Sequence, residues 1–291
     1  MNKGVTLSFQ SLDEGTLKVV RRANIKMDNF RDLIRRYNAE GISTYTELIV
    51  GLPGETYASF ADGVDTLLRA GSHGSLAVYS CEILPNSEMG DPAYQARYGM
   101  KTTHTPVMFY HATPGEGDRY TEWYEIVTET AALSPEDWLR TQLFSWAVQA
   151  FHCLPLTQLL AIYCHAAEGI PYRAFYEGLL RFARTNPQSV IGGAYLRALE
   201  SYENLRAGRP WGYYDRRFGD IIWPPEEGGF LSCVTAGDDF YVELEPFLDG
   251  LLGEMYCEVV DYQTLSVVSP HTVEGESFFL HDLPAFFSAV S

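Results

Sequence analysis

A glycine turn between a strand and a helix is the first feature of the sequence with the chemistry of a binding site. Residues 42–56 read ISTYTELIVGLPGET, and the β-branched, apolar first half is typical of a strand buried on both faces. Gly51 and Gly54 permit backbone conformations that other residues rarely adopt, and Pro53 stiffens the turn. A helix beginning near Thr56 adds free N–H groups beside it. The turn suits a planar or anionic ligand, or else it is an ordinary strand-to-helix corner.

The segments on either side of this turn predict two more strands, with helices in the connections. Residues 4–12 (GVTLSFQSL) indicate a short strand with a polar end, and residues 75–89 (SLAVYSCEILPNSEM) indicate a strand that closes in a proline turn. Residues 13–24 and 28–41 are amphipathic at helical spacing. Connections of this length are too long for hairpins, so we expect parallel strands with a ligand face at their carboxyl ends.

Three motifs, in this order and spacing, resemble the second half of the radical S-adenosylmethionine (SAM) domain. They are FQSLDEGTLKVVRRAN (9–24), ELIVGLPGET (47–56) and YSCEILPNSEM (79–89). Among the branches of that family they look most like the cobalamin-binding radical SAM proteins and the related methylthiotransferases. The resemblance implies the last three strands of a partial six-stranded βα barrel. We therefore expect an α/β fold, a three-strand parallel βα half barrel followed by a mostly helical carboxyl-terminal domain.

The resemblance also implies where SAM is bound. Gln10 and Ser11 match the strand end that contacts the ribose or carboxylate of SAM, and residues 83–85 match the strand end that packs on the adenine. Glu47, if it points into the barrel, is a candidate contact for SAM or substrate. Glu55 is expected to cap the following helix. The residues predicted to bind the cofactor are Gln10, Ser11, Glu47, Gly51, Leu52, Pro53, Gly54 and Leu84.

The sequence lacks the family's cluster motif. In the family, a Cys-x-x-x-Cys-x-x-Cys loop binds three irons of a [4Fe-4S] cluster, and SAM chelates the fourth. No such spacing occurs among the five cysteines, which are Cys81, Cys153, Cys164, Cys233 and Cys257. The resemblance thus implies SAM as a ligand here, with the cluster and, in one branch, cobalamin in the complete enzyme, neither ligated by this chain. Met1 resembles an internal or premature start, so we expect the missing amino-terminal half, from the same gene or a separate chain, as a partner.

The composition of the chain limits which other partners it is expected to bind. The chain has 291 residues, with Lys+Arg 21 against Asp+Glu 38 and a formal net charge of -17. Nucleic acids and anionic membranes are bound by basic surfaces, so this balance argues against both. No apolar run is long enough to span a bilayer. An odd number of irregularly spaced cysteines is typical of reduced thiols in a cytoplasmic protein. We expect a small-molecule substrate.

The middle of the chain offers weaker signals. Residues 91–119 have little periodicity and predict an irregular connection across the barrel mouth, in which His104, Tyr110 and His111 are available but histidines are more often surface residues. Ser134 followed by Pro135 predicts a helix start.

Helical patterns then continue to about residue 207, and the stretch from Trp211 to Glu227 has the pattern of an extended crossing. The pairs His152-Cys153 and Cys164-His165 allow a zinc site, although core packing is the more usual role of such residues on apolar helices.

These patterns predict a chain of three regions. Residues 1–112 are the carboxyl-terminal half of the radical SAM barrel, 113–210 a helical domain, and 211–291 a small mixed or helical region. The function we infer is that of a radical SAM enzyme's carboxyl-terminal portion, inactive alone. The complete enzyme would cleave SAM reductively to a 5′-deoxyadenosyl radical and, with cobalamin, transfer a methyl group to a small molecule. Two alternatives remain: a non-catalytic subunit that pairs through an open sheet edge, and a cobalamin-independent enzyme such as a methylthiotransferase.

Overall fold

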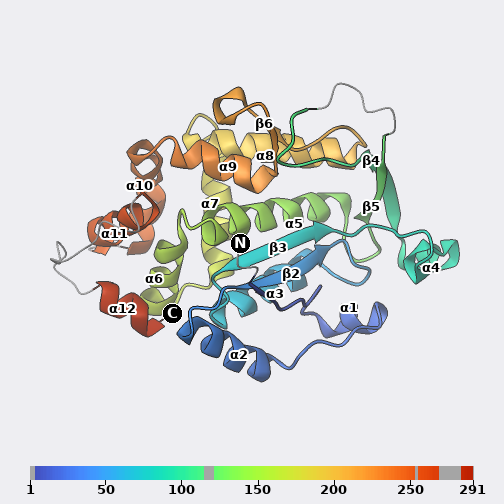
Figure 1. Ribbon diagram of the computed structural model, residues 1–291, viewed down its shortest axis with the longest axis horizontal. Coiled ribbons are helices and arrows are strands. Elements are labelled where there is room, and N and C mark those ends of the chain that lie inside the picture. The colour runs from blue at the N-terminus through green and yellow to red at the C-terminus, as the bar shows by residue number, and fades with distance from the viewer. Residues whose placement is uncertain (1–3, 115–120, 253–254, 269–282, 291) are drawn as a thin grey trace.

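A small parallel sheet lies at the centre of the molecule (Figure 1). The structure, a computed structural model, describes residues 4–114, 121–252, 255–268 and 283–290. Hydrogen bonding runs in the order β1-β2-β3, and both neighbouring pairs are parallel. The three strands are β1 (Val5–Thr6), β2 (Thr44–Val50) and β3 (Ser75–Ser80). Their connections contain α1 (Glu14–Val19), α2 (Met27–Ala39) and α3 (Tyr57–Arg69). The predicted α/β fold with a three-strand parallel sheet is confirmed.

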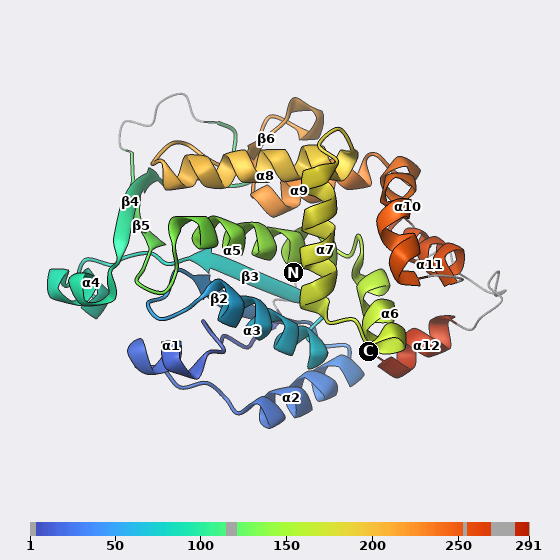
Figure 2. The same cartoon turned by 180° about the vertical axis from the view of Figure 1, so that it is seen from behind.

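The two faces of β2 differ in burial. Its residues alternate strictly between buried and half-buried, with Leu48 and Val50 on the buried face and Glu47 and Ile49 on the other. The buried face joins a core that includes residues of α3, which lies against the sheet beside α5 and α7 (Figure 2). The expectation of a strand buried on both faces was therefore wrong. One face is packed, and the other remains accessible to a ligand.

The helix after the glycine turn, α3, begins at Tyr57, and Thr56 is its N-cap residue. The Thr56 hydroxyl accepts a hydrogen bond from the N–H of Ser59, and the Ser59 hydroxyl accepts one from the N–H of Thr56, which is a capping box. Glu55 was expected to cap this helix, and that prediction was wrong because Glu55 precedes the cap. Its carboxylate is buried and instead accepts from the Ser59 hydroxyl at 2.7 Å.

Residues 91–119 are more regular than predicted. They contain α4 (Pro92–Tyr98) and β4 (Lys101–Pro106), which pairs antiparallel with β5 (Trp123–Glu129). β5 also bonds to the chain just after β3, since the N–H of Val127 donates to the carbonyl of Cys81 at 2.9 Å. The expectation of an irregular connection was wrong because β4 pairs with β5, a strand that begins after the end of the segment. The hairpin extends the carboxyl end of the sheet.

The rest of the chain is mostly helical, as predicted. The helix α5 (Pro135–Ala147) runs on through a π-helical turn, η2 (Val148–Cys153), beside β3. There the Gln149 side chain accepts from the N–H of Val78 at 3.2 Å, so helical side chains cover this sheet edge. The remaining long helices are α6 (Gln158–Glu168), α7 (Tyr172–Thr185), α8 (Val190–Arg206), α9 (Pro225–Val234), α10 (Asp238–Leu252), α11 (Tyr256–Val268) and α12 (Leu283–Val290).

Short elements connect these helices, and one core joins them to the sheet. Before α9 lies a hairpin of two short strands, β6 (Tyr213–Tyr214) and β7 (Ile222–Trp223), with the turn η3 (Arg216–Phe218) between them. Another short turn, η1 (Glu88–Gly90), precedes α4. A contiguous core cluster runs from Phe9 beneath the sheet to Phe287 in α12. The proposed boundaries near residues 112 and 210 stay predictions.

No single helix within the described ranges is long and apolar enough to cross a membrane. Among the described residues, one bent pair, α5–η2 with α6 at 95°, is long and apolar enough when its two helices are taken together.

Gly54 offers a test of the turn. Its φ is +95°, whereas a Cβ there would meet Thr16 at an ordinary 3.6 Å, so the strain of Gly54→Ala lies in the backbone. We expect a loss of about 1–2 kcal/mol in the free energy of unfolding. Gly193→Ala is the control, because Gly193 lies inside α8 with nothing within 4 Å of its Cβ position. Thermal melts would contradict a requirement for positive φ at Gly54 if Gly54→Ala and Gly193→Ala lowered the melting temperature equally, or if neither lowered it.

Candidate active site

The first two predicted residues lie where β1 ends. Gln10 has a φ of +63°, and its carbonyl accepts from the N–H of Ile49 at 2.8 Å, which ties it to β2. Ser11 is buried, and its hydroxyl accepts from the N–H of Asp13 at 3.0 Å. In this structure both residues therefore shape the turn that leads into α1, and their contact with SAM stays a prediction.

The glycine turn is mostly covered. Gly51 has a φ of +97°, and a Cβ there would lie 3.2 Å from the carbonyl oxygen of Val127. Leu52 packs with Cys81 in a small core cluster, and Pro53 is buried as well. Gly54 alone among these four turn residues is exposed. A ligand at this edge would therefore meet the turn at Gly54, and the other predicted contacts remain untested.

Glu55 carries a buried polar atom at the same edge. Its Oε1 is hydrogen-bonded to Ser59, but its Oε2 is buried without a hydrogen-bond partner in the described structure. Burial raises the pKa of this carboxyl group, and the nearby hydroxyls of Ser11 and Ser59 lower it by less. An unpaired buried carboxylate oxygen is costly unless a ligand or a proton satisfies it. Glu55 is thus a better-placed polar contact than its predicted capping role suggested.

The other two predicted residues lie on the open side of the sheet. Glu47 is half-buried, and its carboxylate accepts a hydrogen bond from the Ser8 hydroxyl. Leu84 is 58% exposed and lines a cavity together with Ile49 of β2. Of the eight predicted residues, Leu84 is the one that lines this cavity.

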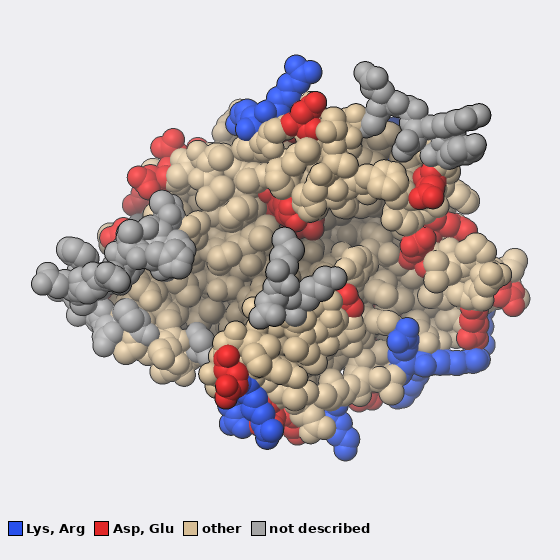
Figure 3. All heavy atoms as spheres, viewed as in Figure 1, with Lys and Arg blue, Asp and Glu red and all other residues tan. Residues whose placement is uncertain are grey.

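A cavity of about 640 Å³ lies between the sheet and the helical layer. This face of the molecule is hollowed between the strands and α8–α9, and carboxylates lie around the hollow (Figure 3). The strands contribute Ala77 and Tyr79 of β3, and the hairpin contributes Tyr124. The helical side contributes Tyr202 of α8 and Glu226 of α9. Its size and mixed aromatic and polar lining are typical of a small-molecule site.

Two buried polar side chains of the lining have no hydrogen-bond partner within the described residues. The Tyr110 hydroxyl and the Trp211 indole N–H are buried and unpaired, and the two rings meet edge to face at 5.7 Å. The Glu226 carboxylate also lines the cavity, and burial raises its pKa to about 7, although a backbone N–H and nearby His111 act in the opposite direction. Unpaired polar groups around a cavity indicate that a ligand satisfies them.

Close packing fixes the helix that carries Glu226. The Trp146 indole donates to the carbonyl of Pro225 at 3.0 Å. A Cβ at Gly228 would lie 2.1 Å from Cγ of Tyr213, so α9 approaches that ring as only glycine allows. Residues 211–227 were predicted to be an extended crossing, which was wrong from Pro225 onward. Proline at the first helical position and two glutamates in the first turn were the available signal.

The histidines and cysteines lie elsewhere. His104 is exposed on β4, and the His111 Nε2 pairs with a carboxylate oxygen of Glu227 at 2.7 Å. Burial raises the pKa of the Cys153 and Cys164 thiols to about 12. Within the described ranges, no three His, Cys, Asp or Glu side chains are grouped as a metal site would need. The zinc alternative has no support from these residues.

A buried histidine pair offers a pH test. His73 Nδ1 lies 3.0 Å from His152 Nε2, and His152 Nδ1 lies 2.7 Å from the Tyr176 hydroxyl. Burial lowers the pKa of His152 well below its usual value and that of His73 to about 4. Below about pH 6.5 the unfolded chain therefore binds protons that the folded chain does not. Stability should be full above that pH and fall progressively towards pH 4.

Urea unfolding between pH 7.5 and pH 5 measures this loss. His73→Asn should flatten the pH dependence relative to the unmodified chain, because one depressed histidine is removed while the carboxylates are unchanged. Identical slopes for the two proteins would contradict the assignment.

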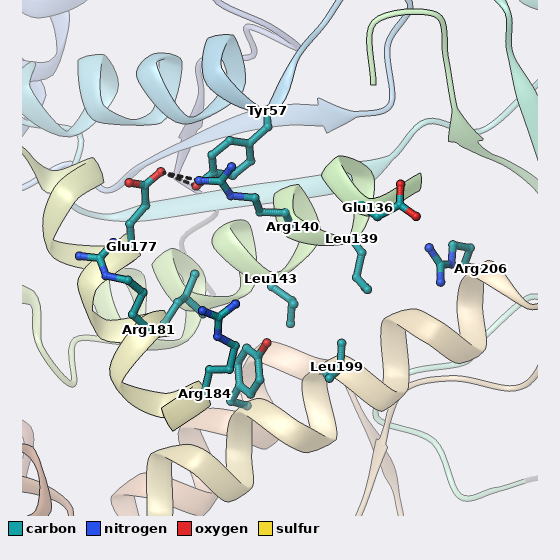
Figure 4. A pocket seen from close by; sticks show the side chains of 12 residues that line it. Tyr57, Glu136, Leu139, Arg140, Leu143, Glu177, Arg181, Arg184, Leu199 and Arg206 are labelled. Carbon is teal, nitrogen blue, oxygen red and sulfur yellow. Dashed lines mark hydrogen bonds and ion pairs between the residues drawn. The ribbon is translucent and has the colours of Figure 1, made fainter. Parts of the chain in front are cut away.

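A second concavity, of about 580 Å³, lies between α5, α7 and α8 and is rimmed by arginines (Figure 4). Arg140 stacks on Tyr57 at 3.6 Å, and the Tyr57 hydroxyl donates to Glu177 at 2.6 Å. These contacts tie α3 to the helical region. Arg181 and Arg184 are exposed at the rim. Since no strand residue lines this groove, it is set apart from the sheet edge where SAM contacts are predicted.

Comparison with known proteins identifies relatives of the whole chain. No family model matches it. It is 38% identical, over 98% of its length, to the cobalamin-dependent radical SAM methyltransferase TokK of Streptomyces tokunonensis. The chain is a relative of cobalamin-dependent radical SAM methyltransferases. It is also 37% identical, over 85% of its length, to the 2-(S-pantetheinyl)-carbapenam-3-carboxylate methyltransferase of Streptantibioticus cattleyicolor.

The resemblance to cobalamin-type radical SAM proteins is thereby confirmed, and it extends past the three motifs into the helical region. The chain spans 45% of the first relative and 38% of the second, less than half of either.

Proposed function

We propose that this chain supplies the carboxyl-terminal part of a SAM barrel and the substrate cavity of a cobalamin-dependent radical SAM methyltransferase acting on a small molecule. The observation that carries the proposal is the cavity of about 640 Å³ beside β3, in a chain 38% identical to such a methyltransferase. A parallel βα sheet presents ligands at its carboxyl end, where this cavity lies next to Leu84. Aromatic side chains of Tyr110, Tyr124 and Trp211 line the cavity, which suits an intermediate that must react away from water.

The residues present do not fit an iron-sulfur cluster. The sequence contains no Cys-x-x-x-Cys-x-x-Cys, and no described group of side chains replaces it. The SAM-facing edge fits a polar ligand better, since Gly54 is exposed and Glu55 keeps one buried oxygen unpaired. We propose that this chain contacts SAM there and that the cluster and cobalamin are held by another part of the enzyme.

The proposed substrate is a small molecule of the size of the relative's carbapenam. The cavity volume lies within the range of small-molecule sites. The net charge of -17 favours such a substrate over RNA, because RNA is bound through basic surface. A compound named for the S. cattleyicolor relative, 2-(S-pantetheinyl)-carbapenam-3-carboxylate, is therefore the first probe substrate to test.

The two alternative functions, an interaction subunit and a methylthiotransferase, would use different features of the protein. An interaction subunit would use the outer edge of β1, which pairs with β2 on one side only within the described sheet. A methylthiotransferase would need no cobalamin. The unpaired polar groups of the cavity favour an enzyme with a bound ligand over an interaction subunit. The 38% identity to a cobalamin-dependent methyltransferase favours methyl transfer over methylthiolation.

A fusion protein tests the proposal. The fusion places the amino-terminal part of the S. tokunonensis relative, the part outside the aligned region, before this chain. We call this fusion the joined protein. We expect it to load a cluster and cobalamin, to form 5′-deoxyadenosine from SAM, and to methylate the probe substrate. A joined protein that loads both cofactors but gives neither product would overturn the proposal, and cleavage of SAM without any dependence on cobalamin would favour the methylthiotransferase.

A further inference from the structure

Two arginines of the groove between α5, α7 and α8 have no acidic partner within the described residues. Arg181 and Arg184 line this groove and are exposed, and neither guanidinium makes a hydrogen bond or an ion pair there. They lie three residues apart on α7, so their side chains are neighbours on one face of the helix. Like charges at this spacing destabilise a helix. An anion bound to both would remove that repulsion.

The acids of the same groove do not serve this pair. Glu177 lies four residues before Arg181, but its Oε1 already accepts from the Tyr57 hydroxyl at 2.6 Å and from the Arg173 guanidinium at 3.2 Å. Glu136 lines the groove from the first turn of α5 and forms no ion pair with the arginines of α7 in the described structure. The positive charge of α7 is therefore left for a ligand.

Apolar side chains line the rest of the groove. Leu139 and Leu143 of α5 lie across from Leu199 of α8 (Figure 4), and Leu180 lines the groove from α7. Leu143 is buried and the other three leucines are half-buried, so apolar surface remains uncovered beside the arginines. Tyr195 of α8 adds a hydroxyl that has no hydrogen-bond partner among the described residues. A ligand here would meet both an apolar surface and hydrogen-bond donors.

This lining selects the chemistry of the ligand. A guanidinium donates through a planar fork that matches the oxygens of a carboxylate or a phosphate. A cationic ligand would face two arginines and be repelled, and a neutral one would leave their charge unpaired. The groove, of about 580 Å³, has the size of a small-molecule site. Since the chain has a net charge of -17, this arginine pair is a local exception on a surface that otherwise disfavours anions.

We propose that the groove between α5, α7 and α8 binds a small molecule with an oxyanion, a carboxylate or a phosphate, at one end and an apolar chain at the other. The oxyanion accepts from Arg181 and Arg184, and the chain packs on the leucines. None of the residues that line this groove lines the cavity beside β3. The groove is thus a second ligand site, and binding there requires no step of the proposed methyl transfer.

Titration calorimetry on the full chain tests the ligand class. The probes are octanoate, octyl phosphate, octan-1-ol, octylamine and hexaglutamate. Octanoate and octyl phosphate should bind about tenfold more tightly than octan-1-ol, as expected for two exposed guanidinium–oxyanion pairs, and the tighter of the two identifies the oxyanion. Octan-1-ol or octylamine binding as tightly as octanoate would overturn the proposal. Hexaglutamate binding more tightly than octanoate would replace the small molecule by an acidic peptide.

Variants place the binding in the groove. Arg181→Gln combined with Arg184→Gln should abolish the preference for octanoate over octan-1-ol, because the oxyanion then meets no guanidinium of α7. Arg31→Gln combined with Arg35→Gln on α2 is the matched control, since it changes the net charge equally outside the groove. Leu199→Gln should weaken octanoate and octan-1-ol alike, by about threefold, and leave the preference unchanged.

Thermal melts establish that each variant folds, and the four arginines are exposed, so their replacement should cost little stability. An octanoate preference that survives in the folded α7 variant, or that is lost equally in the α2 control, would refute the arginine contact. If Leu199→Gln fails to fold, the arginine comparison still decides. Because binding is measured without catalysis, failure of the joined protein to methylate its probe would not imitate either result.

Discussion

The chain alone should bind no [4Fe-4S] cluster and should form no 5′-deoxyadenosine from SAM under reducing conditions. A cluster needs three closely spaced thiolates, and the five cysteines have no such spacing. Burial opposes thiolate formation as well, since it raises the pKa of Cys81, Cys153 and Cys164 to about 12. Anaerobic reconstitution with iron and sulfide, followed by visible absorbance and chromatography of the nucleoside products, measures both expected results.

The joined protein is the control for this experiment, because the same chain is then supplied with a cluster loop. We expect the joined protein to form 5′-deoxyadenosine and the chain alone to give only the background level. A stoichiometric cluster in the chain alone, with reductive SAM cleavage, would show that it is an enzyme by itself.

Gly228→Ala should be the most destabilising single methyl group that can be added near the cavity. A Cβ there would lie 2.1 Å from Cγ of Tyr213, so either α9 or the β6–β7 hairpin must move. Overpacking of this kind costs about 3 kcal/mol. Because Glu226 lies in the first turn of the same helix and lines the cavity, the shape of the cavity should change together with stability.

Gly250→Ala is the matched control for this substitution. Gly250 lies inside α10, nothing lies within 4 Å of its Cβ position, and alanine favours helix. Its melting temperature should be equal to that of the unmodified chain or slightly higher. A Gly228→Ala protein that melts at the same temperature as the Gly250→Ala control would show that the packing of α9 against Tyr213 is not required for stability.

The parts of the fold that were predictable are those with a local signal. The alternation in TYTELIV, the glycine turn and the amphipathic pattern of α3 are each encoded within a few residues, so β2 and the helix after it could be placed from the sequence. The hairpin could not, because Thr102 pairs with Val127 across a connection too long for a turn signal to be read.

The cavity was not predictable for a related reason. Tyr110, Tyr202, Trp211 and Glu226 come from four separate parts of the chain, and no spacing in the sequence links them. The predicted SAM contacts lie at the strand ends, because the family motifs there are short contiguous stretches that can be read from the sequence. Tyr110 was noticed among loop residues, but its burial beside Trp211 depends on the packing of the β6–β7 region.

Methyl transfer by the joined protein carrying Ala77→Trp tests most directly whether this cavity holds the substrate. Ala77 lines the cavity from β3, and an indole there would fill much of it. Ala58→Trp, at an exposed position of α3, is the control. The predicted result is that Ala77→Trp still cleaves SAM to 5′-deoxyadenosine but methylates the probe substrate at background level, while Ala58→Trp does both. Undiminished methylation by a folded Ala77→Trp protein would contradict a substrate site in this cavity.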